Sequence, residues 1–200
     1  MPDAEEPSAT RRRRAALAGH EGDLATARAL LDDPDGEVRA TALGAVARLG
    51  AATGADVGRA LRDAAPTVRR RACEVAVTLG KGDVRLLLDD ADASVVETAA
   101  WALGERGEAT DPVVDSLART ATDHADPLCR EAAVAALGAL GNERGLSAIL
   151  AAAGDKPAVR RRAVIALAPF DGPEVEAALR RALSDRDRQV RQAAEDLLNP

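Results

Sequence analysis

The chain repeats one short pattern along most of its length, and this repetition limits its fold more than any other feature. Aligning on the valine of "EVRATA" places an anchor residue at Val38, Val68, Val95, Leu128, Val159 and Val190, with spacings of 30, 27, 33, 31 and 31 residues. Alanine stands four residues after every anchor, at Ala42, Ala72, Ala99, Ala132, Ala163 and Ala194. Apolar residues follow at the seventh and eighth positions, and at about 100° per residue all of these positions share one stripe. Each anchor therefore begins a helix that buries this stripe.

A second amphipathic segment precedes each anchor, so the pattern describes pairs of helices. The first helices of the pairs are expected at 24–31, 56–63, 83–90, 112–120, 145–153 and 173–183. The apolar 46% of the chain is dominated by alanine, with Trp101 and Phe170 as its only aromatic residues. Alanine suits closely packed helices, whereas sheets favour the β-branched and aromatic residues that this chain uses sparingly. Helix pairs that recur about every 30 residues predict an all-α solenoid of about six pairs.

These pairs resemble HEAT repeats, in particular the short bacterial type grouped with phycobilisome-lyase HEAT-like repeats. The resemblance covers about residues 22–199 and is carried by "DPDGEVRATA", "DAAPTVRRRA" and "DRDRQVRQAA", which share the pattern D(x4)VR(x2)A. It implies a right-handed α-α superhelix in which aspartates and arginines of adjacent repeats form a structural hydrogen-bonded ladder. The matching ladder residues are Asp33, Arg39, Asp63, Arg69, Arg160, Asp185 and Arg191. Val96 and Cys129 replace the arginine and Gly154 replaces the aspartate, so we expect a weaker ladder in the third and fourth repeats.

The two ends of the repeat array carry their own signals. The segment "RRRRAALAG" at 11–19 resembles the second helix of a degenerate repeat, and we expect a capping helix at about 10–19. Residues 1–9 are acidic, contain proline and lack apolar periodicity, which predicts a disordered tail. We expect residues 10–200 to form a single solenoid domain.

Charge and composition exclude several classes of function. The net charge of -6 disfavours non-specific attraction to nucleic acid or to anionic membranes. No apolar run approaches the roughly 20 residues of a membrane span, and the N-terminus has no apolar stretch typical of a secretory signal. Cys73 and Cys129 fit no CxxC pattern, so we expect reduced structural thiols. These features predict a cytoplasmic protein with no membrane partner. They do not determine the oligomeric state, for which we expect a monomer or a weak homodimer.

The resemblance places the second helices on the concave face of the solenoid, where the positions opposite the buried stripe are available to a ligand. The sixth positions after the third, fourth and fifth anchors are Trp101, Val134 and Ile165, which predict an apolar strip about 20 Å long with Leu137 beside it. The basic second positions are Arg70, Arg130 and Arg161. An exposed apolar patch with a charged rim is typical of a protein or peptide site. We therefore predict a non-enzymatic scaffold or adaptor whose arginines select an acidic or C-terminal segment over a basic one.

Other uses of this surface stay open. Trp101 can instead fold over the neighbouring helix to fill space that the alanines leave, or the strip can form a homodimer. Nucleic acid is the main alternative partner, because HEAT-like alkylpurine DNA glycosylases, which the chain resembles in architecture only, bind DNA on a concave face with basic residues. Against it, Glu74, Glu97 and Asp196 lie among the arginines, and Trp101 alone would stack on bases. A component similar to a bilin lyase is a further alternative.

The sequence offers little for catalysis. His20 and His124 fall in predicted turns, and neither has a serine or cysteine partner at a recognisable spacing. HEAT-repeat deoxyhypusine hydroxylase binds two irons through several His-Glu dipeptides, whereas this chain has only His20-Glu21. We expect no catalytic residue, no metal site and no cofactor.

Overall fold

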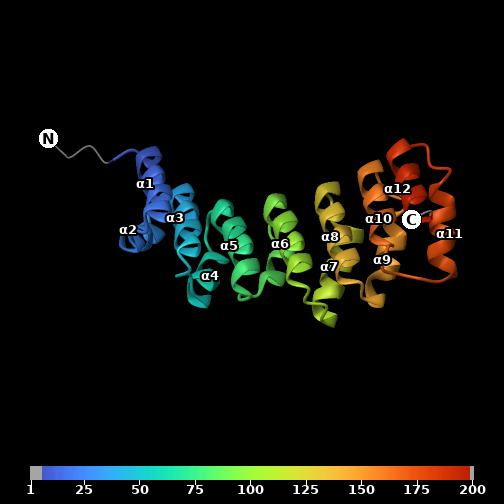
Figure 1. The fold of residues 1–200 in the computed structure, drawn as a ribbon, viewed down its shortest axis with the longest axis horizontal. Coiled ribbons are helices and arrows are strands. Elements are labelled where there is room, and N and C mark those ends of the chain that lie inside the picture. The colour runs from blue at the N-terminus through green and yellow to red at the C-terminus, as the bar shows by residue number, and fades with distance from the viewer. Residues whose placement is uncertain (1–5, 199–200) are drawn as a thin grey trace. The chain divides into compact units, whose positions relative to one another are not determined.

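The computed structural model describes residues 6–198, and these residues form helices joined by short turns without any strand. The helices along this part of the chain are α1 (Ser8–Glu21), α2 (Leu24–Ala29), η1 (Leu30–Asp32), α3 (Gly36–Arg48), α4 (Gly54–Ala60), α5 (Pro66–Leu79), η2 (Val84–Asp89), α6 (Ala93–Arg106), α7 (Asp111–Asp123), α8 (Pro127–Leu140), η3 (Glu143–Gly145), α9 (Leu146–Ala152), α10 (Pro157–Ala166), α11 (Pro173–Ala182) and α12 (Arg188–Leu198). The predicted all-α repeat fold is confirmed (Figure 1).

The helices group into two compact units, which we describe separately. Unit 1 ends at Val84, and in it α3 packs between α1 and α5, with α2 against α3 and α4 against α5. Unit 2 begins at Arg85, and in it α8 packs between α6 and α10, while α10 also contacts α12. Within each unit the second helices of successive pairs therefore lie side by side (Figure 1). The single domain expected over residues 10–200 stays a prediction.

Local sequence signals set the bounds of the second helices. Aspartate side chains cap four of them, because Asp35, Asp92, Asp126 and Asp187 each accept a hydrogen bond from the backbone N–H two residues later. Proline occupies the first turn of α5, α8 and α10, where its missing N–H costs no helical bond. Glycine with positive φ ends α5, α6 and α8. The chain thus begins and ends these helices without tertiary help.

The buried stripe of the second helices confirms the repeat pattern in five of the six pairs. The alanines four residues after the anchor are fully buried there, at Ala42, Ala72, Ala99, Ala163 and Ala194. The fourth pair is an exception, because Leu128 is 56% exposed while Cys129 and Ala133 are fully buried. The predicted anchor Leu128 is therefore wrong by one residue, and Cys129 takes its place. Pro127 gives the signal that was missed, since Pro66 and Pro157 each precede a true anchor by two residues.

Small residues allow neighbouring second helices to approach closely. A Cβ atom at Gly138 of α8 would lie only 2.6 Å from the Cβ of Ala166 in α10. At Gly104 of α6 it would lie 3.1 Å from the Cα of Ala136 in α8. These contacts explain how a chain so poor in aromatic residues builds a core. Alanine and glycine let neighbouring helices approach closely, so large side chains are not needed to fill the space between them.

The N-terminal end begins with a helix longer than expected. The capping helix was expected at about 10–19, and α1 runs from Ser8 to Glu21, so it includes the last two residues of the segment expected to be disordered. Residues 1–5 of that segment lie outside the described residues. Ala15 and Ala18 of α1 are buried against α3. Among residues 6–198, no helix is long and apolar enough to cross a membrane.

Candidate binding surface

Pairs of arginine and aspartate link adjacent repeats and fix the second helices side by side. In each pair the guanidinium donates two hydrogen bonds to one carboxylate, and the N–O distances are 2.9 and 2.6 Å for Arg39 with Asp63. They are 2.6 and 2.8 Å for Arg130 with Asp155, and 2.9 and 2.7 Å for Arg160 with Asp185. Such two-pronged, charge-assisted bonds also fix the orientation of both partners. The ladder predicted from the sequence is thus present in both units.

Each ladder arginine also holds the turn of its own repeat. Arg39 donates to the carbonyl oxygen of Asp33 at 2.8 Å, and Arg160 donates to that of Asp155 at 2.8 Å. Arg69 and Arg191 make the same bond to the carbonyl oxygens of Asp63 and Asp185. The ladder arginine therefore closes its own helix pair as well as contacting the next one.

The ladder reaches further at one end than the sequence indicated. Arg11 of the capping helix donates to Asp33 at 2.7 and 3.1 Å, so α1 joins the same network. Arg12 and Arg14 instead lie near Glu37 and Glu6 on the surface. The four arginines at 11–14 therefore do not act as one cluster, because neighbouring residues on a helix point in different directions.

The ladder keeps its aspartates charged. The hydrogen bond from Arg11 is the largest influence on Asp33 and holds the pKa of its carboxyl below the ordinary value. Hydrogen bonds from Arg130 and Arg160 likewise lower the pKa of Asp155 and Asp185. For Asp63 partial burial alone would raise the pKa, but hydrogen bonds from Arg39 and from the Ala65 amide outweigh it and lower it.

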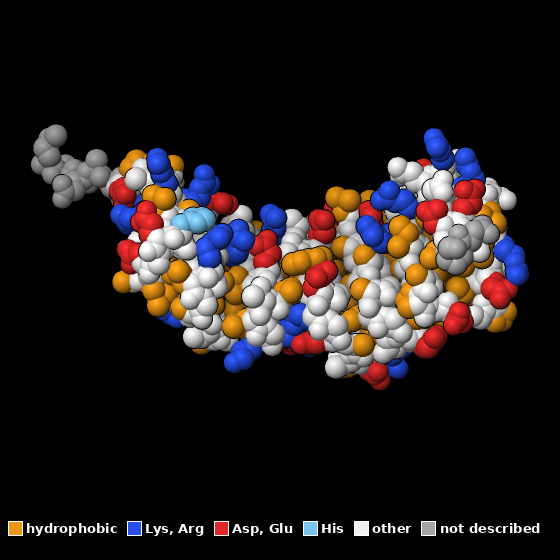
Figure 2. All heavy atoms as spheres, viewed as in Figure 1, with side chains coloured by type: hydrophobic (Ala, Val, Ile, Leu, Met, Phe, Trp, Pro, Cys, Tyr) orange, Lys and Arg blue, Asp and Glu red, His pale blue; other side chains and the backbone are white. Residues whose placement is uncertain are grey.

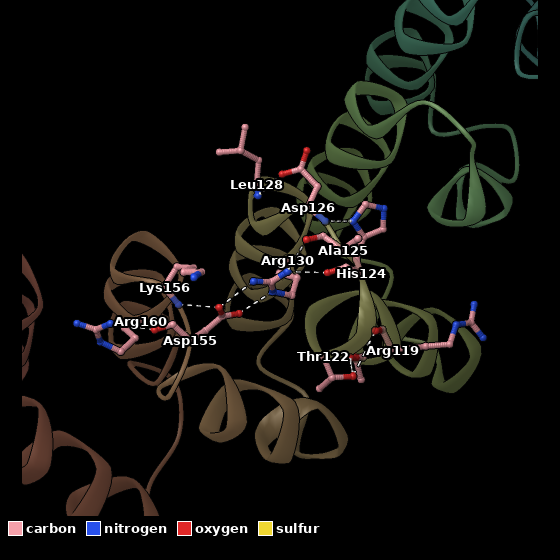
Figure 3. A network of polar contacts seen from close by, with 11 residues as sticks. Arg119, Thr122, His124, Ala125, Asp126, Leu128, Arg130, Asp155, Lys156 and Arg160 are labelled. Atoms are coloured by element: carbon pink, nitrogen blue, oxygen red, sulfur yellow. Dashed lines mark hydrogen bonds and ion pairs between the residues drawn. The ribbon is translucent and has the colours of Figure 1, made fainter.

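Arg130 was predicted to face a ligand, and this prediction is wrong. The corrected register of α8 places Arg130 directly after its anchor, where it bonds Asp155 and the carbonyl oxygen of His124, as Figure 3 shows. The expectation that Gly154 breaks the ladder is also wrong, because the adjacent Asp155 supplies the carboxylate. The fourth repeat therefore keeps its ladder arginine.

The ladder is interrupted between α6 and α8, where both of its members are replaced. Val96 occupies the arginine position of α6 and is fully buried. His124 occupies the aspartate position of the next turn, and its Nδ1 accepts a hydrogen bond from the Asp126 N–H at 3.1 Å. The aspartates of other turns accept the equivalent bond, for example Asp63 from Ala65. Histidine thus preserves the turn but not the ion pair.

Two of the four apolar residues predicted to line a binding surface are core residues. Val134 and Leu137 have exposed fractions of 0% and 1%, so the prediction that they face a ligand is wrong. The error follows from the one-residue shift in α8, which moves Ala135 to the position equivalent to Trp101 and Ile165. Trp101 and Ile165 are 45% and 42% exposed, as the angular argument requires.

An open hollow of about 410 Å³ lies on the surface of α6 and α8, within unit 2. We call it the α6–α8 hollow. Its lining residues are Glu97, Thr98, Trp101, Gly104 and Glu105 of α6, Leu128, Glu131, Ala132, Ala135, Ala136 and Ala139 of α8, and Arg162 of α10. Ile165 of α10 is exposed as well, but it does not line the hollow. Leu128 and the alanines were not predicted to line a binding surface, although aligning Pro127 with Pro66 and Pro157 shifts α8 by one residue and indicates them.

The rim of this hollow is acidic, contrary to the basic rim that the sequence suggested. Glu97 and Glu105 are exposed and form no ion pair within residues 6–198, while Glu131 lies 3.5 Å from Arg162. In Figure 2, hydrophobic (orange) and acidic (red) side chains lie next to each other in the region that α6 occupies in the same view in Figure 1. Arg161 is half-buried and bonds Gln189 at 3.2 Å, and Arg70 belongs to unit 1. No predicted arginine therefore lines the hollow.

The hollow carries no group prepared for covalent or metal chemistry. Cys129 of α8 is fully buried with its thiol 3.2 Å from the Ala93 carbonyl oxygen, and burial, aided by Asp126 and Glu97, raises the pKa of this thiol to about 11. A thiol with so high a pKa is a poor nucleophile. Across the described part of the chain, His, Cys, Asp and Glu side chains form no group of three or more that could hold a metal ion.

Comparison with known proteins identifies the repeat. The sequence profile of HEAT repeats matches residues 57–138 and 83–158, which together span just over half of the 200 residues. No curated protein matches the sequence.

Solved structures share the fold at low sequence identity. Human deoxyhypusine hydroxylase in complex with glycerol is 20% identical with a TM-score of 0.51, over 98% of this chain and 80% of that one. A designed armadillo repeat protein in complex with the peptide (KR)4 is also 20% identical with a TM-score of 0.51, over 98% and 93%. An engineered protein reaches a TM-score of 0.58 at 18% identity, over 94% and 62%. At these identities the similarity concerns the fold alone.

Proposed function

Because the chain belongs to the HEAT-repeat family, we propose that it is a non-enzymatic scaffold that binds a segment of another protein in the α6–α8 hollow. The observation that carries this proposal is the exposure of two large apolar side chains, Trp101 at 45% and Leu128 at 56%, on the walls of one hollow. Large apolar residues gathered at a concave surface mark interaction sites more often than scattered single ones do.

The scaffold supports this use of the hollow. The side chains below it are fixed, because Ala133, Val134 and Leu137 of α8 are buried and the Arg130 ion pair holds the start of the helix. A wall that does not rearrange on binding loses little conformational entropy, so the apolar contact area is available for affinity. At about 25 cal/mol per Å² of apolar area, one leucine or isoleucine that enters the hollow contributes about 1.5–3 kcal/mol.

A protein segment fits this surface better than nucleic acid does. Glu97 and Glu105 would repel phosphate groups. Of the three arginines predicted to face a ligand, Arg130 is in the ladder and Arg161 bonds Gln189, while the exposed Arg70 belongs to unit 1 and does not line the hollow. The designed armadillo repeat protein that shares the fold holds a peptide, which supports peptide binding as a use of such helix arrays. Deoxyhypusine hydroxylase shares the fold as well, but the described residues here contain no metal-binding group of the kind an iron enzyme needs.

Selection from a displayed library of random peptides tests the proposal directly. We expect the wild-type protein to enrich peptides that the double variant Trp101→Ala, Leu128→Ala no longer retains, because both apolar walls are lost. Leu86→Ala is the matched control, since Leu86 is 54% exposed on η2 and does not line the hollow. Peptides that bind the double variant as well as the wild type would contradict the proposal.

A further inference from the structure

We propose that the partner segment is extended and basic, with one bulky apolar side chain in the α6–α8 hollow and a lysine or arginine two residues before and two residues after it. This inference rests on the proposed function and adds the chemistry of the ligand. It reverses the acidic partner that the sequence alone suggested, because the residues that line the hollow carry the opposite charge.

The spacing of the carboxylates comes from the geometry of α6. Glu97, Trp101 and Glu105 stand four residues apart and therefore share one side of the helix, with the indole between the two carboxylates. At a rise of about 1.5 Å per residue, the two glutamates are separated by about 12 Å along the helix axis. Both are exposed and form no ion pair within the described residues, so neither charge is already satisfied by the protein.

The opposite wall of the hollow is apolar and lies on α8. Leu128 stands at its beginning and Ala132, Ala135 and Ala139 continue it, while the carboxylate of Glu131 lies 3.5 Å from the guanidinium of Arg162. That pair is neutral as a whole. The unbalanced charge of the hollow therefore comes from the two glutamates of α6, on either side of Trp101.

These two walls favour an extended segment over a helix. The helices α6 and α8 approach each other too closely, at Gly104 and Ala136, to admit a helix of about 10 Å diameter between them. In an extended chain, residues two apart point to the same face, and four residues span about 13 Å. Cations at the first and fifth positions would thus reach Glu97 and Glu105, while the third side chain enters the hollow beside Trp101.

The charge of such a segment determines its affinity for the hollow. Each contact between an exposed carboxylate and a cation is weak, but reversing both charges replaces two attractions with two repulsions. We expect a difference of about tenfold in dissociation constant between a basic and an acidic segment at low salt. Because the contacts are exposed, this difference should shrink as ionic strength rises and the Debye length falls to about 3 Å near 1 M.

Three synthetic peptides with glycine on either side test this inference, read out by the fluorescence of Trp101, the only tryptophan of the chain. Their cores are Lys-Ser-Leu-Ser-Lys, Glu-Ser-Leu-Ser-Glu and Ser-Ser-Leu-Ser-Ser. We expect the first to bind about ten times more tightly than the second, with the neutral peptide between them. In the variant Glu97→Gln, Glu105→Gln the three should bind alike, and the affinity of the neutral peptide should stay unchanged, which also shows that the variant is folded.

The outcomes separate this inference from the proposed function. If the acidic peptide binds as tightly as the basic one, or if the double glutamine variant keeps the preference, the basic partner is wrong while the hollow remains a peptide site. If no peptide changes the fluorescence and the displayed library enriches nothing that depends on Trp101, the proposed function is wrong. Self-association in sedimentation experiments that shields Trp101 without peptide would make a second copy of the chain the occupant and would overturn the inference.

Discussion

The two units of this protein use the same scaffold but present different surfaces on their second helices. In unit 1 the positions equivalent to Trp101 hold Gly44 and Glu74, and Glu74 pairs with Arg71 on the same helix. In unit 2 these positions hold Trp101, Ala135, Ile165 and Asp196, and Asp196 accepts a hydrogen bond from Gln192 on the same helix. The two units therefore differ in their apolar members, because only unit 2 exposes large apolar side chains at this position, Trp101 and Ile165. Glu97 and Glu105 on the helix of Trp101 form no ion pair within residues 6–198.

The residues that build the fold do not differ in this way. Arg39 and Asp63 in unit 1 have the same bonds as Arg160 and Asp185 in unit 2, and the alanine four residues after the anchor is buried in both. Repetition therefore marks the positions required for folding. The positions free to carry function are those where the repeat tolerates glycine, glutamate or tryptophan alike.

The largest expected effect concerns this shared scaffold. Removing the guanidinium in Arg160→Ala leaves the Asp185 carboxylate without its main partner in a site where the two side chains are 8% and 16% exposed. We expect a loss of about 3 kcal/mol in the free energy of unfolding. Arg39→Ala should cost nearly as much in unit 1, where the side chains of the pair are 18% and 17% exposed. Urea unfolding followed by circular dichroism measures both losses.

If only one of these two variants lost stability, the ladder would not stabilise both units alike. Arg180→Ala is the control, because its ion pair with Glu176 is exposed and contributes about 0.5 kcal/mol or less. A loss for Arg180→Ala equal to that for Arg160→Ala would mean that burial of the ladder contributes nothing.

Acid should weaken the ladder in both units. The pKa values of Asp33, Asp63, Asp155 and Asp185 are lowered in the folded protein, so their contribution to stability is complete above the ordinary carboxyl pKa near 3.8. It is lost as the pH falls through the lowered values, because protonation then favours the unfolded chain. We expect the urea midpoint to fall below pH 4, and to fall less steeply in Arg160→Ala. Equal slopes for the variant and the wild type would contradict the assignment of the pKa shift to Arg160.

A second pair of variants makes the same substitution in both units with opposite results. In Gly138→Ala the new Cβ would lie 2.6 and 2.7 Å from the Cβ and Cα of Ala166, so α8 and α10 must separate. We expect a loss of about 2 kcal/mol. Gly44→Ala places its Cβ no closer than 3.5 Å to the Arg71 side chain, and should gain about 0.5–1 kcal/mol from helix propensity. Thermal unfolding distinguishes the two, and a loss in both variants would show that α3 packs against α5 at Gly44 as tightly as α8 packs against α10 at Gly138.

The sequence predicted the scaffold well because the repeat is imposed by packing. The spacing of the anchors and the buried alanines predicts paired helices, and the resemblance to HEAT repeats implies the ladder at the matching aspartates and arginines. The surface was predicted less well because a single offset decides what a helical residue faces. Choosing Leu128 instead of Cys129 as the anchor rotated the predicted orientation of α8 by about 100°. The prediction therefore placed the buried Val134 and Leu137 on the surface and left Arg130 out of the ladder. Cysteine is buried as readily as the other anchors, so Cys129 can take the anchor position.

The smallest expected effect on stability tests the assignment of Trp101 to the surface. Trp101→Ala removes a side chain that is 45% exposed, so we expect a loss of about 1 kcal/mol or less, whereas Val134→Ala removes fully buried methyl groups and should cost about 2 kcal/mol. Iodide should quench the fluorescence of the wild-type protein strongly, and a bound peptide should protect it. If Trp101→Ala costs more than Val134→Ala and iodide has no access, then Trp101 belongs to the core, and the difference between the units at this position rests on Ile165 alone.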